Sequence, residues 1–287
     1  MAESAQLAVL FPGQGSQTEG MRDAVESARP DLLELAVATL GEDPFDRVGE
    51  GTRFDQLAIF CASLAGYEGL GRPRPGFFAG HSLGEIGALA AAGAFADADA
   101  LHVVAERGRL MQEAADAAEP GGMLALRADR ERAEEIAAGA GVTVANDNAP
   151  RQVVLSGPTT GLEAAEREAQ EAGVRAKRLD VGGPFHSPAI EAAVPRFRAV
   201  LDDVEVREPD IPVFSCVTCA PFDDARLRLS QALTNPVRWL ETLRALHAAG
   251  ARRYLETGPG RTLSGLVRRS LDGVEVETAE LPVAARG

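Results

Sequence analysis

The sequence predicts an α/β fold built in two parts, a layered core and a smaller unit inserted into it. Short apolar runs typical of buried strands alternate with helical patterns in the first and last thirds of the chain. The middle third instead carries a β-α-β-β-α-β pattern within about 60 residues, which is typical of a ferredoxin-like unit. Glycine- and proline-rich breakers at 119–122 and 182–184 bracket that unit. We therefore expect a ferredoxin-like small subdomain at 121–185 and a core formed by 1–120 and 186–287.

The elements of the core follow from hydrophobic periodicity. Leu7–Phe11 is an apolar run ended by Pro12-Gly13, which is typical of a buried strand that ends in a loop. Further strands are predicted at "PGFFAG", "IPVFSCV" and "RRYLETG". Helical periodicity predicts helices at 21–40, 55–71, 83–93, 97–117, 187–202, 226–249 and 261–271. We expect the last dozen residues to fray.

The insert carries its own alternation of strands and helices. "GMLALRA", "GVTVANDNAPRQVVLSG" and "VRAKRLDVG" predict its strands, the second of these segments containing two of them. Helical patterns at 129–139 and 159–172 separate them. The pattern therefore predicts a sheet covered by two helices.

Composition argues against several classes of function. No apolar run reaches membrane-spanning length, and the first residues lack the basic region of a signal peptide, so we expect a cytoplasmic protein without a membrane partner. The net charge of −14 argues against nucleic acid as a partner. Cys216 and Cys219 have metal-like or redox-like spacing, but no second ligand pair accompanies them. We expect two small residues near a strand end and no metal site.

Residues 80–84, "GHSLG", fit the G-x-S-x-G pattern of a nucleophile elbow. The context agrees, because "PGFFAG" predicts a strand before the serine and "LGEIGALAAAGAF" predicts a helix after it. Ser82 would then lie at the positive end of a helix, and the Leu83 N–H is a natural oxyanion donor. The pattern predicts Ser82 as a nucleophile. The alternative is a glycine-rich turn with a capping serine.

A serine nucleophile needs a base, and the chain has four histidines. His81 adjoins the serine, and its side chain is expected to point away from the site. His102 and His247 lie on helical patterns, which favours packing or surface positions. His186, in "VGGPFHSPAI", lies in a glycine- and proline-rich loop just before a predicted helix. Because such a loop can bring an imidazole to the mouth of a site, we predict His186 as the base.

Six motifs identify a known family by their order along the chain. They are FPGQGSQTEGM (11–21), AGHSLGEIGAL (79–89), ERGRLMQ (106–112), FHSPAI (185–190), NPVRW (235–239) and LETGPGRTLSGL (255–266). In this order they resemble malonyl-CoA:acyl-carrier-protein transacylases, enzymes of bacterial fatty-acid synthesis related to the acyltransferase domains of polyketide synthases. The resemblance covers nearly the whole chain. It implies a hydrolase-like α/β core with a parallel sheet, an inserted ferredoxin-like subdomain and a site between the two.

The resemblance also implies the roles of individual residues. Ser82 would take the acyl group, with His186 as its base and the N–H groups of Gln14 and Leu83 as the oxyanion hole. Arg107 would grip the free carboxylate of the malonyl group, a task for which a planar, permanently charged guanidinium is well suited. Without its motif, Arg107 would be interpreted as a surface residue or a structural ion pair.

Two further substrate-binding residues follow from the resemblance. Phe185 matches the bulky residue of malonyl-selective polyketide acyltransferases, although it could equally belong to the core. Arg238 replaces a glutamine that some family members carry, near backbone carbonyls that orient the histidine. Asn146 and Asn148 are candidates to face the cleft, with turn formation as the alternative.

The implied activity is a ping-pong transfer of malonyl from malonyl-CoA to the phosphopantetheine thiol of acyl carrier protein. No metal or redox cofactor is implied, and a monomer is expected. Candidate docking residues for the acidic carrier protein are Arg175, Lys177 and Arg178, or Arg268 and Arg269. Alternatives within the class are a trans-acting polyketide acyltransferase and the malonyl-loading subunit of malonate decarboxylase. From another class, a serine hydrolase or thioesterase would release the acyl group to water.

Overall fold

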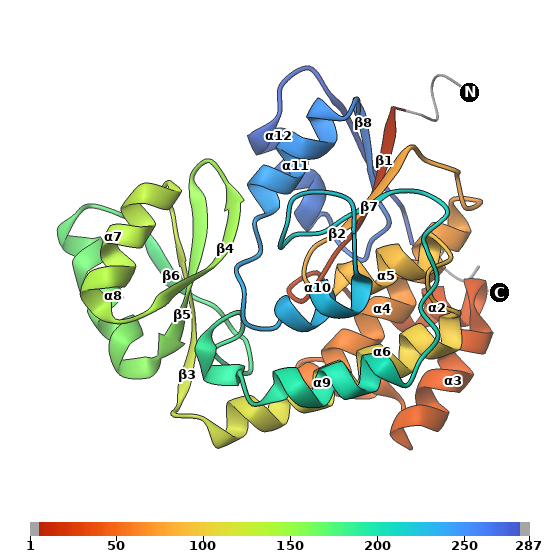
Figure 1. Cartoon of the computed structure of the whole chain (residues 1–287), viewed down its shortest axis with the longest axis horizontal. Helices are drawn as coiled ribbons and strands as arrows, with labels where there is room; N and C mark the ends of the chain where they lie inside the picture. The colour runs from red at the N-terminus through yellow and green to blue at the C-terminus, as the bar shows by residue number, and fades with distance from the viewer. Residues whose placement is uncertain (1–5, 282–287) are drawn as a thin grey trace.

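The computed structural model describes residues 6–281 and shows two sheets, each with its own helices (Figure 1). Within these residues the core sheet has five strands in the order β7-β2-β1-β8-β9, and all of its neighbouring strands are parallel. In that order the strands are β7 (Val213–Phe214), β2 (Phe77–Gly80), β1 (Leu7–Phe11), β8 (Arg253–Glu256) and β9 (Glu275–Thr278). The predicted α/β core with a parallel sheet is confirmed.

Helices cover both faces of the core sheet. Their bounds are α2 (Met21–Ala28), α3 (Pro30–Leu40), α4 (Thr52–Gly69), α5 (Gly84–Ala91), α6 (Asp97–Ala117), α9 (Ala193–Asp202), α10 (Ala225–Gln231), α11 (Trp239–Ala248) and α12 (Thr262–Ser270), with 3-10 turns η1 (Pro44–Arg47) and η2 (Pro188–Ile190). In the described part of the chain, no helix is both long enough and apolar enough to cross a membrane.

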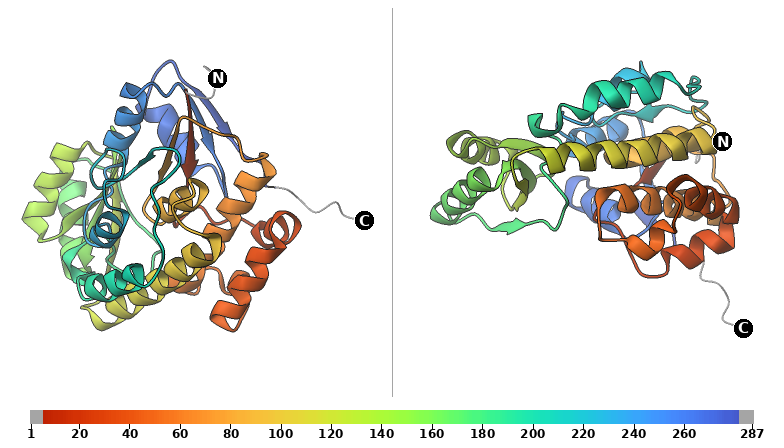
Figure 2. Two further views of the ribbon diagram at one scale, coloured as in Figure 1. Left: turned by 45° about the vertical axis from the view of Figure 1, so that its right-hand side comes forward. Right: turned by 90° about the horizontal axis from the view of Figure 1, so that it is seen from below.

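The central strand β1 explains the layering, because all five of its residues are buried. Successive side chains of a strand point to opposite faces. Leu7, Val9 and Phe11 therefore pack with α2, α4, α5 and α6, whereas Ala8 and Leu10 pack with α11 and α12. Figure 2 shows α6, in yellow, running along the core and ending beside the second sheet.

The second sheet lies at one end of the core (Figure 1) and is antiparallel, with the order β4-β5-β3-β6. Its elements are β3 (Gly121–Leu126), α7 (Arg130–Ala140), β4 (Thr143–Ala149), β5 (Gln152–Pro158), α8 (Thr159–Glu171) and β6 (Ala176–Arg178). Leu124 and Leu126 pack under α7 and α8, while Met123 joins the cluster of the core. The opposite face of this sheet is therefore turned toward the core.

Prolines and edge pairing explain where the helix and strand boundaries differ from the sequence predictions. The predicted helix 21–40 is two helices that meet at Arg29-Pro30, because proline lacks an N–H donor and disfavours helical backbone before it. Likewise 226–249 is divided into α10 and α11, and Pro236 lies between them. The prediction that the last dozen residues fray is wrong for 276–278, which pair with β8, while 282–287 lie outside the described residues.

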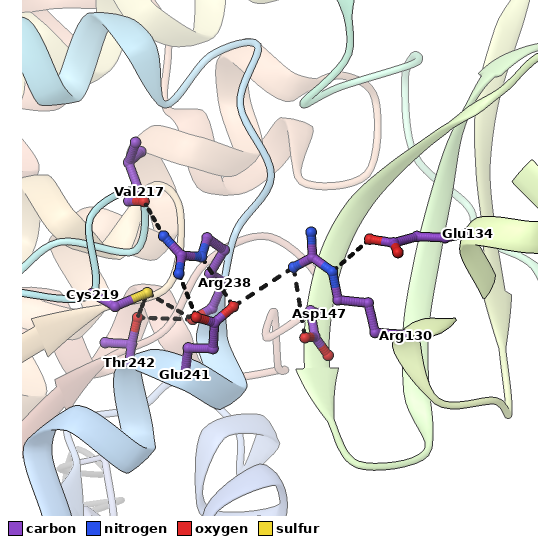
Figure 3. A network of polar contacts seen from close by, with 8 residues as sticks. All are labelled: Arg130, Glu134, Asp147, Val217, Cys219, Arg238, Glu241 and Thr242. Atoms are coloured by element: carbon purple, nitrogen blue, oxygen red, sulfur yellow. Dashed lines mark hydrogen bonds and ion pairs between the residues drawn. The ribbon is translucent and has the colours of Figure 1, made fainter. Parts of the chain in front are cut away.

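Ion pairs join the small subdomain to the core (Figure 3). Arg130 of α7 lies 3.8 Å from the Asp147 carboxylate and 3.7 Å from the carboxylate of Glu241 on α11. Glu241 also pairs with Arg238, whose guanidinium donates to the carbonyl of Val217 at 3.1 Å. This network fixes β4 beside the start of α11.

Backbone hydrogen bonds reinforce that junction. Asp147 N–H donates to the Val237 carbonyl at 2.9 Å, and Val237 N–H donates to the Ala145 carbonyl at 2.8 Å. The segment before α11 thus acts as a short extra strand against β4. It aligns the polar residues Asn146 and Asn148 along the cleft between the two units.

Candidate active site

Ser82 lies on a tight turn between β2 and α5. Its φ of 54° is in the left-handed region, which a residue with a side chain rarely adopts. The flanking glycines are required by space, because a Cβ on Gly80 would lie 1.9 Å from Gly84 C, and a Cβ on Gly84 would lie 2.0 Å from the carbonyl oxygen of Phe11. The strained strand-to-helix turn predicted from "GHSLG" is therefore present in this structure.

His186 reaches Ser82 from a distant loop. Its Nε2 lies 2.8 Å from Ser82 Oγ, and its Nδ1 lies 2.8 Å and 3.2 Å from the carbonyl oxygens of Ala232 and Asn235. Because carbonyls only accept hydrogen bonds, Nδ1 carries the proton and Nε2 is free to accept one from the serine. Among the described residues, two backbone carbonyls and no carboxylate orient this ring.

Burial lowers the pKa of His186 to about 3, and the Arg107 cation acts in the same direction. The imidazole is therefore neutral at neutral pH. A neutral imidazole with an unprotonated Nε2 is the form that a general base requires.

Arg107 of α6 is the third group at this point. It is 3% exposed, and its two terminal nitrogens donate to Ser82 Oγ at 3.1 Å and to Gln56 Oε1 at 2.7 Å. Within residues 6–281 no carboxylate pairs with it. Burial lowers its pKa to about 10, so the guanidinium stays charged at neutral pH. A buried cation without an ion pair is costly, and this one lies beside Ser82.

A chain of amides holds Arg107 in place. Gln56 of α4 accepts from Arg107 and donates to Gln14 Oε1 at 3.1 Å, and Gln14 Nε2 donates to Thr52 Oγ1 at 3.2 Å. The sequence reasoning missed Gln56. The available signal was a lone amide within the apolar run "QLAIF", a position that is fully buried here.

Two backbone N–H groups close to the serine turn have no hydrogen-bond partner among residues 6–281. Neither the Gln14 N–H nor the Leu83 N–H donates to another described residue. Leu83 precedes α5, and the loop that holds Gln14 lies close to the turn, since a Cβ on Gly13 would be 2.5 Å from the His81 carbonyl oxygen. The Leu83 N–H lies at the N-terminus of α5, where a free donor favours negative charge.

Glu85 lies buried behind the serine turn. Its Oε1 accepts from the Cys216 N–H at 2.7 Å, while its Oε2 has no hydrogen-bond partner among the described residues. Burial raises the pKa of Glu85 to about 7, against the opposing effects of the Cys216 N–H and the Arg107 cation. The carboxyl group ties the segment after β7 to the first turn of α5.

The pocket at Ser82 holds about 140 Å³, equivalent to a few water molecules. Phe185, Asn146 and Asn148 line it. His81 also lines it, although its ring was expected to point away, and its Nε2 is 2.8 Å from Asn148 Oδ1. Arg238 does not line this pocket, because its side chain is held by Glu241 and Val217 at the subdomain junction. The pocket has room for a small acyl group.

The two cysteines of "CVTC" take part in packing. Cys216 Sγ donates to the Gly80 carbonyl at 2.8 Å, and Cys219 Sγ lies 3.7 Å from Thr242 Oγ1. Over residues 6–281 no group of three His, Cys, Asp or Glu side chains could hold a metal ion. Cys216 therefore supports the strand that leads into the serine turn.

Comparisons with known proteins agree with this geometry. The chain is 39% identical over 284 residues to the polyketide biosynthesis protein ThaF of Burkholderia thailandensis, covering 92% of this chain but only 24% of that longer protein. It is 37% identical over 306 residues to the malonyl CoA-acyl carrier protein transacylase of Bacillus subtilis, covering 97% and 96% of the two chains. The crystal structure of the malonyl-CoA:acyl carrier protein transacylase of Xanthomonas oryzae pv. oryzae matches with a TM-score of 0.90 at 33% identity, covering 97% and 95%. The model of the acyl transferase domain family matches residues 46–283. The chain therefore belongs to the acyl transferase domain family, as its motifs predict.

Proposed function

We propose that the protein transfers the malonyl group of malonyl-CoA to the phosphopantetheine thiol of an acyl carrier protein through a malonyl ester of Ser82. The observation that carries this proposal is Arg107, a buried cation that forms an ion pair with no carboxylate of residues 6–281, 3.1 Å from Ser82 Oγ. A substrate with a free carboxylate supplies the missing anion. The names of the full-length relatives, which are malonyl transacylases, support the same substrate.

The first half-reaction loads the enzyme. As Ser82 Oγ attacks the thioester carbon, its proton passes to His186 Nε2, and the oxyanion forms beside the N–H groups of Gln14 and Leu83. Collapse breaks the C–S bond, and His186 returns the proton to the departing CoA thiolate. The product is the malonyl ester of Ser82.

The second half-reaction runs the same steps with a new thiol. The phosphopantetheine sulfur attacks the malonyl ester while His186 takes its proton, and the tetrahedral intermediate releases Ser82, which regains the proton from His186. All the groups named in these steps come from one chain, so a monomer would suffice, and none of the proposed steps requires a metal or redox cofactor. Arg107 retains the malonyl carboxylate throughout.

Selectivity follows from two residues. An acetyl group would leave Arg107 desolvated and unpaired, so acetyl-CoA should be a poor donor. Phe185 lines the pocket and would meet a methyl branch on the malonyl group, a discrimination of about 1–3 kcal/mol. Arg238 acts instead as a positioning residue, because its backbone and side chain fix the segment near the His186-orienting carbonyls.

A second acceptor is favoured by one comparison. The similarity to ThaF supports a carrier protein of polyketide synthesis as an alternative acceptor for the same malonyl-serine. The chemistry at Ser82 is the same for both acceptors. Kinetics with purified carrier proteins of the two pathways would show which one has the higher kcat/KM.

The experiment that tests the proposal is intact-mass spectrometry after mixing the protein with malonyl-CoA, acetyl-CoA or methylmalonyl-CoA. A malonyl adduct on Ser82 that is absent in Ser82→Ala and largely lost in Arg107→Ala is expected. Equal labelling by acetyl-CoA would refute the role of Arg107. Rapid release of malonate to water without a carrier protein would indicate a hydrolase instead.

A further inference from the structure

Glu85 is a buried carboxyl group that the proposed reaction does not use. It is 0% exposed and lies in the first turn of α5, directly behind the serine turn. One of its oxygens, Oε1, accepts from the Cys216 N–H at 2.7 Å, while Oε2 has no hydrogen-bond partner among the described residues. The ionised form of such a group is costly unless a nearby charge of opposite sign compensates it.

Arg107 is the cation that provides this compensation. The two residues hold Ser82 from different helices: the Glu85 N–H donates to the Ser82 carbonyl at 3.0 Å, and the Arg107 guanidinium donates to Ser82 Oγ at 3.1 Å. Both side chains are buried, and α5 packs against α6. Each charge therefore acts on the other through an interior that water does not screen. No hydrogen bond joins them in the described structure, so the guanidinium keeps its donors for other groups.

The other ionisable groups near Glu85 carry no charge at neutral pH. The strands β1 and β2, which lie against α5, have no ionisable side chain. The ionisable side chains of α4 have pKa values that are shifted by burial and by charges other than Glu85, and the buried ones are Asp55, Cys61 and Tyr67. Burial holds the pKa values of four groups around the serine turn so that they are neutral at pH 7, and these are Cys216, Cys219, His81 and His186. The protonation of Glu85 thus depends mainly on its burial and on Arg107.

We propose that Glu85 is the internal counter-charge of Arg107 in the empty enzyme, and that it takes up one proton from solvent when the malonyl carboxylate binds to Arg107. This inference rests on the proposed function, because it requires the substrate carboxylate at Arg107. The bound carboxylate offsets the guanidinium charge, so the Glu85 carboxylate loses the field that stabilises it. A proton then forms an O–H bond with Glu85, and the buried site keeps the net charge it had before binding.

The proton and the malonyl group should strengthen each other's binding, because linkage between two ligands is reciprocal. Burial raises the pKa of Glu85 to about 7 in the empty enzyme, and the substrate carboxylate should raise it further. At pH values well below 7, Glu85 is protonated in both states and binding takes up no proton. Above pH 7, binding must also protonate Glu85, so the Kd for malonyl-CoA should rise with pH by about fivefold or more before it levels off. Acetyl-CoA brings no carboxylate, so its Kd should not show this rise.

The first test counts protons during binding. Ser82→Ala cannot be acylated, so titration calorimetry of this variant measures binding alone. Titrations at about pH 8 in buffers of different ionisation enthalpy give the number of protons taken up. Malonyl-CoA should take up more protons than acetyl-CoA, by a difference of at most one.

Two further substitutions assign the proton to a residue. In Ser82→Ala/Glu85→Gln the excess uptake with malonyl-CoA should vanish, and the Kd for malonyl-CoA should no longer rise between about pH 7 and pH 9. Glutamine keeps the acceptor for the Cys216 N–H, so this variant removes the charge and leaves the contact. Ser82→Ala/Glu106→Gln is the matched control, since Glu106 adjoins Arg107 in sequence and pairs with Arg109. The excess uptake should persist in it.

The second test identifies the protonated group by infrared difference spectroscopy. Addition of malonyl-CoA to Ser82→Ala should produce the C=O stretching band of a protonated carboxyl group, and acetyl-CoA should not. The band should be absent in Ser82→Ala/Glu85→Gln. If Glu85 only tied the segment after β7 to α5, malonyl binding would produce no such band.

Three outcomes separate this inference from the proposed function. Tighter binding of malonyl-CoA than of acetyl-CoA without excess proton uptake would overturn the inference and leave the proposed function intact. Excess uptake that persists in Ser82→Ala/Glu85→Gln would overturn the assignment to Glu85. Equal Kd values for the two donors would refute the carboxylate contact at Arg107, and the inference with it. The comparison of the two donors needs no substitution at Glu85, so it remains decisive if Glu85→Gln fails to fold.

Discussion

His186 Nε2 lies 2.8 Å from Ser82 Oγ across 104 residues of sequence, and both residues have a positive φ. Two strained backbone positions thus meet at one hydrogen bond. Such strain persists only where the surrounding structure imposes it. In this structure close packing at the glycines of the serine turn holds Ser82, and hydrogen bonds to the carbonyls of Ala232 and Asn235 hold His186.

Removing His186, the proposed base, should slow acylation of Ser82 without abolishing substrate binding. His186→Ala is expected to lower the rate of malonyl-serine formation by about 10²–10⁴, the usual contribution of a positioned general base. Rapid-quench mass spectrometry measures that rate. His247→Ala, a histidine on α11 outside the pocket, serves as the control. A rate within threefold of the wild type would exclude His186 as the base.

Truncating the buried cation Arg107 should reduce the preference for malonyl-CoA over acetyl-CoA. Arg107→Ala is expected to lower kcat/KM for malonyl-CoA by about 10² or more, because a charge-assisted, bidentate contact is lost. kcat/KM for acetyl-CoA should fall much less, since the acetyl group has no free carboxylate to pair with Arg107. Steady-state kinetics with both donors gives the ratio. An equal fall for the two would show that Arg107 acts on the serine alone.

The pH profile should report the lowered pKa of His186. Because its pKa of about 3 lies below the ordinary value of 6.5, the base stays neutral on acidification, and kcat/KM should not decline near pH 6.5. Removing the Arg107 cation removes one of the causes of the lowered pKa. In Arg107→Ala, kcat/KM for acetyl-CoA should therefore begin to decline on acidification at a higher pH than in the wild type. A wild-type kcat/KM that declines with a midpoint near pH 6.5 would contradict this account.

Glu85 should make the free energy of unfolding decrease as pH rises. Its folded-state pKa of about 7 lies above the ordinary 4.5, so the folded chain holds a proton that the unfolded chain has lost between these values. That contribution is complete below pH 4.5 and is lost as pH rises through about 7. Relative to Glu85→Gln, the wild type should lose at most about 1.4 kcal/mol per pH unit across this window. Urea unfolding of both proteins at several pH values tests it, and parallel curves would contradict it.

The serine turn should not tolerate a methyl group on its glycines. Gly84→Ala is expected to cost about 1–3 kcal/mol or more of unfolding free energy, because the new Cβ would lie 2.0 Å from the Phe11 carbonyl oxygen. Gly122→Ala is the matched control, since its Cβ would meet only Leu162 at 3.9 Å. Thermal unfolding of the two variants should differ by several degrees. Similar unfolding temperatures for the two variants would mean that the serine turn shifts to accommodate the added methyl group.

Local sequence patterns predict most of the helices and strands. The elements that they do not predict depend on contacts between distant segments. The apolar run Leu7–Phe11 predicts β1, since a strand buried on both faces needs no partner to be recognised. The strand β9 escaped prediction because "EVET" is polar and exposed, and only its pairing with β8 makes it a strand. The helix 21–40 was predicted as one element because its periodicity continues through Pro30.

The residues of the candidate site also differ in whether local sequence patterns predict them. Ser82 could be predicted from its glycines, and the expected meeting of Ser82 with His186 and Arg107 came from motifs that match a family. Gln56 carries no motif, and its importance appears only when Arg107 lies against it. Arg175, Lys177 and Arg269, which the sequence offers as docking candidates from two separate segments, line one hollow on the small sheet, and their docking role stays a prediction. Only the folded sheet gathers them.

The carbonyls that orient His186 have a consequence for the kind of bond the protein can break. In the proposed mechanism the ring takes the serine proton and becomes a cation that two backbone carbonyls orient, and no carboxylate of residues 6–281 pairs with it. Such an imidazolium is a less stabilised species than one that is paired with aspartate. A thiolate departs readily with little help from an acid, whereas an amine must be protonated before it leaves. The arrangement therefore favours exchange between sulfur and oxygen esters and gives little capacity to cleave a peptide bond.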